Sequence, residues 1–230
     1  YSWDNKNTST GAESNHGKND WTDARLMKLL NPGYESETTG GSLYYNSKSG
    51  NCYAGENNAT KTCNFTSTGI KNDATRNLIA DTTYYLGGWE SDSVYPNQIY
   101  EYERETKVYT GRPTEWTGKI ALAYSSDYGY AVDLSKCGKN LFDYNYSECI
   151  SNDWMKTIVT NGSKGHGWLL TLDSGYSYAA WSVNLSGYAS TSNWAYASNV
   201  QGVVPVLYLN SELSIKAGTG SSSAPYQLSA

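Results

Sequence analysis

The chain has 230 residues, and 17 Lys and Arg against 22 Asp and Glu give it a formal net charge of −5 at pH 7. An acidic chain without a basic cluster cannot neutralise a row of phosphates, which excludes nucleic acid as the expected partner. No apolar run approaches the roughly 20 residues of a membrane-spanning helix, so any signal peptide or anchor is expected upstream of Tyr1.

The aliphatic core residues are scarce. The chain contains 17 Leu, 7 Ile, 9 Val and 2 Phe, about 15% of its length, which is below the roughly 20% at which disorder becomes a concern. However, 22 Tyr and 8 Trp replace the missing aliphatic residues, and disorder also needs few aromatics and a high net charge. We therefore expect a folded, aromatic-rich chain with a polar surface.

Residues 1–19 are polar and irregular, and helix signals follow them. Asn19 or Asp20 is the expected N-cap of the first helix, and Pro32 and Gly33 follow its end. The expected helices run from Asp20 to about Asn31, from Asn72 or Asp73 to Gly87-Gly88, and from Asn152 to about Ile158. Their expected inward-facing residues are Trp21, Leu26, Leu29, Leu30, Leu78, Ile79 and Tyr85.

Strand signals dominate the second half of the chain. The expected strands are Lys119–Tyr124, with Tyr128–Val132 as a possible continuation, then Ala180–Val183 and the buried strand Val203–Leu209. Long loops are expected at 34–71 and 87–118. Early helices, later irregular strands and the lack of a β-α-β rhythm predict an α+β fold. With no internal repeat or dividing linker, residues 20–230 are expected to form one domain after the irregular segment 1–19.

Four cysteines, Cys52, Cys63, Cys137 and Cys149, allow three disulfide connectivities. Pairing of neighbours, Cys52 with Cys63 and Cys137 with Cys149, fits best, because each pair would close a short polar loop. Neither pair has the spacing of metal ligands. Disulfides imply an oxidising compartment, so the protein is expected outside the cell or at its surface.

The segment 173–200 has an unusual composition. From Ser174 to Ser211 the chain has no Asp, Glu, Lys, Arg or His, and the segment is rich in Ser, Ala, Tyr and Asn. Tyr and Trp supply contact area at a small entropy cost, and Ser, Asn and Gly adapt their hydrogen bonds, which is typical of an evolved binding surface. Compact apolar runs flank the segment, as expected for binding loops on a scaffold. The alternative is a set of ordinary surface strands, in which Trp181 and Val183 belong to the core.

These residues also resemble a known family. The runs Gly167–Leu170, Ala180–Val183, Ser186–Tyr188 and Gly202–Leu209 are similar to the C-terminal half of bacterial C-type-lectin-like domains. Those domains are related to formylglycine-generating enzymes, and the likeness is greatest to variable proteins diversified by retroelements. Residues 24–33 and 126–131 also resemble bacterial surface proteins, some of them pilin-like. The resemblance covers about Asp20 to Leu228, with one departure, because Val204 stands where the family pattern usually has Arg.

The resemblance implies a rigid scaffold that displays side chains for binding. Strand alternation puts Trp181 and Val183 on one face and Ser182 and Asn184 on the other, outward face. The expected ligand-binding residues are Asp173, Ser174, Tyr176, Tyr178, Ser182, Asn184, Ser190, Ser192, Asn193, Trp194, Tyr196, Ser198 and Asn199.

Catalytic and metal-binding patterns are weak. His166 is the one plausible base for a serine hydrolase, and its flanking glycines suit an exposed turn instead. Carboxylates at 90 and 92, or at 101, 103 and 105, allow a glycosidase only if they converge in space, and the second group is expected on an exposed strand or loop. We therefore expect no enzyme activity and no cofactor. A structural calcium ion is possible, with oxygen ligands from Asp127, Asp133 and Asp143 or from the loop at Glu90–Asp92.

Two functions follow as hypotheses. The first is a secreted or surface-displayed binding protein of the adhesin type, whose partner is a macromolecule, either protein or glycan. The second is a structural subunit of a surface fibre or pilus, in which the same aromatic surface packs against another copy.

Overall fold

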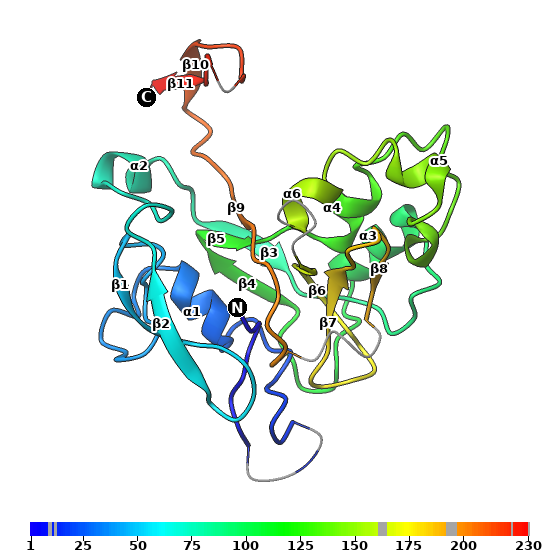
Figure 1. The fold of residues 1–230 in the computed structure, drawn as a ribbon, viewed down its shortest axis with the longest axis horizontal. Coiled ribbons are helices and arrows are strands. Elements are labelled where there is room, and N and C mark those ends of the chain that lie inside the picture. The colour runs from blue at the N-terminus through cyan, green and yellow to red at the C-terminus, as the bar shows by residue number, and fades with distance from the viewer. Residues whose placement is uncertain (9–10, 12, 161–164, 192–196, 222, 230) are drawn as a thin grey trace.

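The computed structural model describes residues 1–8, 11, 13–160, 165–191, 197–221 and 223–229. In these residues short helices mix with short antiparallel strands, which confirms the α+β class (Figure 1). The helices are α1 (Arg25–Leu30), α2 (Asp73–Asn77), α3 (Pro96–Arg104), α4 (Ser125–Gly129), α5 (Ser147–Ile150) and α6 (Lys156–Val159), with a 3₁₀-helix η1 (Leu141–Asp143). The strands are β1 (Ser49–Tyr53), β2 (Thr60–Asn64), β3 (Thr82–Tyr85), β4 (Glu115–Gly118), β5 (Ile120–Leu122), β6 (Gly167–Leu172), β7 (Ala180–Val183), β8 (Ala189–Ser190), β9 (Pro205–Leu207), β10 (Ser214–Ala217) and β11 (Gln227–Ser229).

The strands form small separate sheets. β1 pairs with β2, β3 with β4, β5 with β9 and β10 with β11, all antiparallel. β6, β7 and β8 form a three-stranded sheet with β7 in the centre, where Ser182 lies opposite both Trp168 and Ser190. Segments far apart in sequence are thereby joined, since β5 and β9 pair Ile120 with Leu207.

Two hydrophobic clusters make up the core, and the β6–β7–β8 sheet lies between them. Along β6, Trp168 and Leu170 belong to the first cluster, which surrounds α1, while Leu169 belongs to the second. Along β7, Ala180 belongs to the first cluster and Trp181 to the second. Because successive side chains of a strand point to opposite faces, both faces of this sheet are covered by apolar groups.

The disulfides join neighbouring cysteines, as predicted. Cys52 of β1 is bonded to Cys63 of β2, and Cys137 is bonded to Cys149 of α5. All four cysteines are buried. Each disulfide therefore attaches a short segment of the chain to one of the two hydrophobic clusters.

The first predicted helix exists, but it begins later than expected. α1 starts at Arg25, and its N-cap position is Ala24 rather than Asn19 or Asp20. The Asp20 carboxylate instead accepts hydrogen bonds from the backbone and hydroxyl of Thr22, at 3.1 and 2.6 Å. Such a local turn competes with helix formation, so the helix starts one turn further on.

The second predicted helix is much shorter than expected. Asn72 is its N-cap, since its side chain accepts a hydrogen bond from the backbone N–H of Thr75 at 2.8 Å. The helix ends at Asn77, and the Thr-Thr-Tyr-Tyr run of β3 pairs with β4. These β-branched and aromatic residues favour a strand, and Tyr85 is exposed rather than inward-facing.

The other expected elements are confirmed in part. β7 has the predicted bounds, whereas β5 and β9 occupy the middle of longer predicted strands. The proposed continuation at 128–132 is wrong, because Tyr128 lies in α4. The helix expected from Asn152 to about Ile158 is present only as α6, which begins later and runs from Lys156 to Val159.

The β10–β11 hairpin stands apart from the rest of the molecule (Figure 1). Its strands are almost entirely exposed. In the described part of the chain, no helix is long and apolar enough to cross a membrane.

Candidate ligand-binding surface

The loop 173–179 joins β6 to β7 and carries the most exposed of the predicted ligand-binding residues that the structure describes. Asp173 begins the loop, and its Oδ1 accepts hydrogen bonds from the backbone N–H groups of Gly175 and Tyr176, at 2.7 and 3.0 Å. The side chain of Tyr176 is 56% exposed. The Tyr178 ring lies beside it, with 5.8 Å between the ring centroids. The loop therefore displays an aromatic pair above a tight turn.

Asn19 fixes the backbone of this loop through hydrogen bonds. Its side-chain amide donates to the carbonyl oxygens of Asp173, Tyr176 and Ala179, at 2.8, 2.9 and 2.9 Å. Its backbone N–H donates to the carbonyl of Ser177 at 2.8 Å. Asn19 is fully buried, so these hydrogen bonds are shielded from water and fix the loop backbone.

Arg112 adds a second anchor to the same loop. Its Nη2 donates to the Ser177 carbonyl at 3.0 Å, and its Nε donates to Oδ1 of Asn19 at 3.2 Å. The same Nη2 also pairs with the carboxylate of Glu13. The guanidinium thus connects the loop, Asn19 and the N-terminal segment in one polar network.

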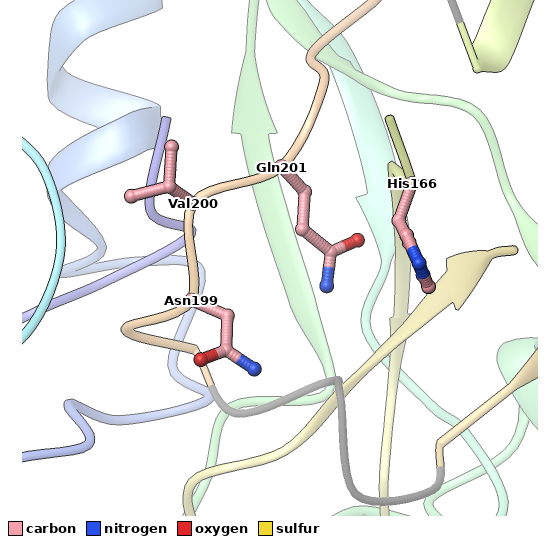
Figure 2. A pocket seen from close by; sticks show the side chains of 4 residues that line it. All are labelled: His166, Asn199, Val200 and Gln201. Carbon is pink, nitrogen blue, oxygen red and sulfur yellow. The ribbon is translucent and has the colours of Figure 1, made fainter. Parts of the chain in front are cut away.

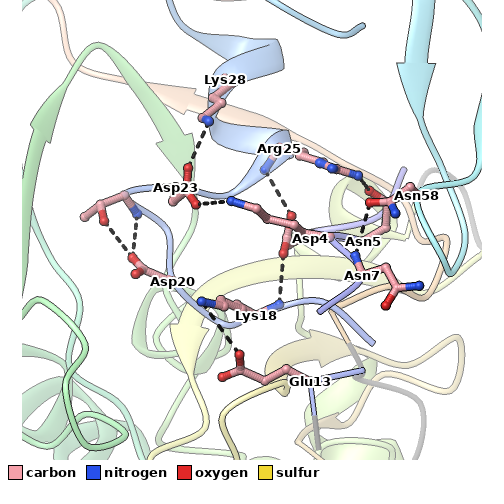
Figure 3. A network of polar contacts seen from close by, with 12 residues as sticks. Asp4, Asn5, Asn7, Glu13, Lys18, Asp20, Asp23, Arg25, Lys28 and Asn58 are labelled. Atoms are coloured by element: carbon pink, nitrogen blue, oxygen red, sulfur yellow. Dashed lines mark hydrogen bonds and ion pairs between the residues drawn. The ribbon is translucent and has the colours of Figure 1, made fainter. Parts of the chain in front are cut away.

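The N-terminal segment is in turn tied to α1 (Figure 3). The Asp4 carboxylate accepts from the backbone N–H of Lys18 at 2.9 Å and from that of Arg25 at 3.5 Å. Burial raises the pKa of Asp4, although these backbone hydrogen bonds act to lower it. Within residues 1–8, 11 and 13–19 the segment has no helix or strand, but Trp3 is fully buried in the first cluster. The irregular segment is therefore part of what supports the loop.

Several predicted ligand-binding side chains do not face solvent. The exposed fractions are 4% for Ser182, 6% for Ser190, 0% for Ser198 and 1% for Asp173. The prediction of an outward face at Ser182 was wrong, because the first hydrophobic cluster covers the face of β7 opposite Trp181. Asp173 holds the loop with one carboxylate oxygen. In the described structure these four side chains are buried, so they do not form part of an exposed contact surface.

Asn184 lies away from the Tyr176 loop. It begins the turn after β7, and its Oδ1 accepts a hydrogen bond from the backbone of Ser186 at 2.7 Å. The four residues of β7 separate the two turns, a span of about 13 Å at the usual rise of a strand. Ser174 is half-buried within the Tyr176 loop. The predicted residues Ser192, Asn193, Trp194 and Tyr196 lie outside the described residues.

Asn199 lines a separate pocket of about 220 Å³ with His166, Val200 and Gln201. Figure 2 shows the polar side chains of Asn199, Gln201 and His166 around one space. Burial lowers the pKa of His166, so its imidazole is neutral at pH 7. The described lining contains no Ser, Cys or carboxylate to complete a hydrolytic site.

The candidate calcium ligands are distributed over different sites. Asp127 accepts a hydrogen bond from the backbone of Tyr124 at the start of α4, and Asp133 pairs with Lys136 at 2.8 Å. Asp143 lines a pocket together with Glu90 and Asp92. Among the described residues, no three His, Cys, Asp or Glu side chains form a group that could hold a metal ion.

The acidic cluster at 101–105 also differs from expectation. It lies at the end of α3 and just beyond it rather than on an exposed strand or loop, and Glu103 is fully buried. This carboxylate accepts hydrogen bonds from Ser126 and from the hydroxyl of Thr171. It joins α3, α4 and β6 in the interior.

Sequence reasoning missed Asn19 and Arg112 as supports of the loop. Asn19 is expected, as one of two candidates with Asp20, at a helix N-cap, and Arg112 gives no local signal. Their partners lie 65 to 160 residues away along the chain, which a local pattern cannot show. In comparisons with protein-family models, with curated proteins and with solved structures, nothing matches the chain.

Proposed function

We propose that this chain is a secreted or surface-displayed ligand-binding protein of the adhesin type, in which Tyr176 and its neighbours contact a macromolecular ligand. The observation that carries the proposal is an exposed tyrosine on a loop held by buried polar groups. Tyr176 is 56% exposed, while Asn19 beneath it is fully buried. A loop that is already ordered loses little entropy on binding, and Tyr is enriched in residues that dominate binding energy.

The scaffold we propose for this surface is a C-type-lectin-like domain of the retroelement-diversified type. The α+β class, the sheet containing Trp181 and the loops around it support this assignment. Diversification would then be confined to exposed positions such as Tyr176, because changes at Ser182 or Ser198 would disturb the interior. The two disulfides support a location outside the cell or at its surface.

The proposal is tested with an array of defined oligosaccharides, together with immobilised mucin and matrix glycoproteins, probed with three forms of the protein. These are the native chain, Tyr176→Ala and the control Tyr226→Ala, whose side chain has a matched exposure of 54% on the distant hairpin. We expect the native chain and the control to bind the same ligand. Tyr176→Ala should bind it about tenfold more weakly or worse, as expected for a central aromatic contact.

Equal binding by Tyr176→Ala and the native chain, with both variants folded, would overturn the assignment of this surface. Sedimentation of the same three proteins tests the alternative function. A native chain that self-associates, and that Tyr176→Ala makes monomeric, would favour a fibre or pilus subunit over an adhesin.

A further inference from the structure

The pocket at the start of β6 is lined by neutral polar side chains. Its volume is about 220 Å³, and its described lining consists of His166, Asn199, Val200 and Gln201. Figure 2 shows the imidazole of His166 and the carboxamides of Asn199 and Gln201 around one space. Sites that enclose a whole small molecule measure roughly 300–1,000 Å³. This smaller pocket therefore admits one ring-sized group of a larger ligand.

Hydrogen bonds fix the backbone on both sides of the pocket. The N–H of Gly202 donates to the carbonyl of His166 at 2.7 Å, and the N–H of Trp168 donates to the carbonyl of Gly202 at 2.9 Å. Gln201 exchanges two backbone hydrogen bonds with Tyr1, at 2.6 and 3.1 Å. Polar side chains on an ordered backbone lose less entropy when they bind a ligand, so the pocket is already formed in the free protein.

The glycine that follows His166 serves close packing rather than an exposed turn. A Cβ at Gly167 would lie 2.2 Å from the carbonyl oxygen of Val159, and a Cβ at Gly202 would lie 3.1 Å from that of His166. Only glycine lets the backbone approach so closely at position 167. His166 is half-buried, and this close packing holds it at the pocket.

The described lining fits a neutral ligand that both donates and accepts hydrogen bonds. Burial lowers the pKa of His166, so at pH 7 no side chain of the described lining is charged. A neutral imidazole and a carboxamide each combine donor and acceptor atoms, and so does the hydroxyl group of a sugar. Val200 is 55% exposed beside these groups and offers an apolar contact to the C–H groups of a sugar ring.

A sugar ring fits this pocket better than a peptide or an ion does. Peptide groups repeat about every 3.3–3.6 Å along an extended chain, so a ring-sized space meets only one or two of them. A pyranose ring carries several hydroxyl groups around its edge, which can serve three convergent side chains together. An ion would give up hydration and find no opposite charge in the described lining, which costs free energy.

The pocket lies within reach of a ligand that contacts the Tyr176 loop. The backbone N–H of Ala197 donates to the carbonyl of Tyr178 at 2.8 Å, and the ring of Tyr178 lies beside that of Tyr176. Asn199 follows Ala197 by two residues, at most about 7 Å of chain. A short run of linked sugar residues spans this distance.

From these contacts we infer that the pocket of His166, Asn199 and Gln201 binds one neutral sugar residue of the ligand. The inference rests on the proposed function and deepens it, because it makes the macromolecular ligand a glycan whose neighbouring residues pack on Tyr176. Three neutral polar side chains around one ring-sized space, next to an exposed aromatic loop, are the juxtaposition that carries it.

The test is a ¹⁵N NMR titration of the full chain with the methyl glycosides of glucose, galactose, mannose, fucose, N-acetylglucosamine and N-acetylgalactosamine. We expect at least one glycoside to shift the backbone amides of residues 199–202 and the side-chain amides of Asn199 and Gln201. Salt at about 0.5 M should leave these shifts in place, because screening acts on charges. The control probe is acetyl-asparagine-amide, which offers amides without hydroxyl groups and should leave the same signals unchanged.

Two matched variants locate the site. Asn199→Ala should weaken glycoside binding about fivefold, the loss expected for one neutral hydrogen bond. Asn145→Ala makes the same change at an exposed position between η1 and α5 and should leave binding unchanged. The ¹⁵N spectrum of each variant shows whether it is folded, and the titration of the native chain does not depend on either.

Three results would overturn the inference. They are no shift of these amides with any of the glycosides, equal effects of the two folded variants, and shifts produced by acetyl-asparagine-amide alone. The third result would favour a peptide as the occupant of the pocket.

The two proposals fail separately. Ligand binding that depends on Tyr176, but persists after enzymatic removal of the ligand's glycans, overturns the pocket alone. Glycoside shifts at the pocket, in a chain whose ligand binding is insensitive to Tyr176→Ala, overturn the Tyr176 surface alone.

Discussion

At the scale of single residues, Glu103 contributes to the pH dependence of stability. Its side chain is fully buried, and it accepts hydrogen bonds from the backbone of Ser126 at 3.0 Å and from the hydroxyl of Thr171 at 2.6 Å. Burial raises the pKa of Glu103 from 4.5 to about 7, although the hydrogen bonds from Ser126 and Thr171 act in the opposite direction. The folded protein therefore keeps this carboxyl group protonated well above its ordinary range.

We predict that Glu103→Gln flattens the pH dependence of stability between pH 5 and 7.5. In this range the folded state holds a proton on Glu103 that the unfolded state has lost, so the free energy of unfolding falls as the pH rises. Between pH 5 and 7.5 the fall attributable to Glu103 is about 2 kcal/mol, because this range covers most of a pKa difference that is worth roughly 1.4 kcal/mol per unit. Gln is neutral at both pH values and removes this contribution.

Urea unfolding at pH 5 and at pH 7.5 measures the effect, with the exposed Glu101→Gln as the control. The difference in unfolding free energy between the two pH values should shrink in Glu103→Gln and persist in Glu101→Gln. Parallel pH dependences for the native chain and Glu103→Gln would contradict the assignment.

At the scale of elements, β7 shows what a local pattern can and cannot predict. The alternation of Trp181 and Val183 gave the strand its correct bounds and correctly placed both residues in the core. The pattern could not show what covers the other face, because that cover is the first hydrophobic cluster, which includes Trp3 of the N-terminal segment. Trp168 lies opposite Ser182, and Trp3 Nε1 donates to the carbonyl of Leu169 at 3.3 Å.

Ser182→Arg should therefore unfold or strongly destabilise the protein. An arginine at this position would bury an unpaired charge, at a cost of more than about 3 kcal/mol in unfolding free energy. Ser186→Arg is the matched control, since Ser186 lies exposed in the turn after the same strand. Thermal unfolding by circular dichroism compares the two variants. Equal melting temperatures would show that Ser182 faces solvent and would restore it as a candidate contact residue.

The composition of the sequence predicted a binding segment at the Tyr176 loop, but it did not predict which residues hold the loop in place. The Tyr- and Ser-rich sequence indicated a binding segment, and it includes the exposed Tyr176. The hydrogen bonds that fix this loop come from Asn19 and Arg112, which are remote in sequence. A local pattern also extended the second helix through Thr82–Tyr85, because it could not show that β4 offers these residues a partner.

At the scale of the whole molecule, stability depends on the two clusters and not on the C-terminal hairpin. In the described residues, the last segment that packs on either cluster is β9, through Val206 and Leu207, together with the next residue, Tyr208, whose ring centroid lies 5.8 Å from that of Tyr84 in the first cluster. Beyond it, Asn210 donates to the carbonyls of Leu78 and Asn77, at 2.9 and 2.8 Å. The strands of the hairpin contact mainly each other, and a two-stranded hairpin adds little stability by itself.

Removal of residues 214–230 should therefore leave the melting temperature within about 2 °C of that of the full chain, since 1 kcal/mol shifts it by about 2–4 °C at this size. Scanning calorimetry of the two chains measures this difference. Ile120→Ala serves as the positive control, because Ile120 is fully buried and its truncation should cost about 2–5 kcal/mol. If the shortened chain melts as far below the full chain as Ile120→Ala does, the hairpin contributes to the core after all. If its melting temperature is unchanged, the hairpin is structurally independent of the two clusters, and Tyr226 is then a sound exposed-tyrosine control for the surface around Tyr176.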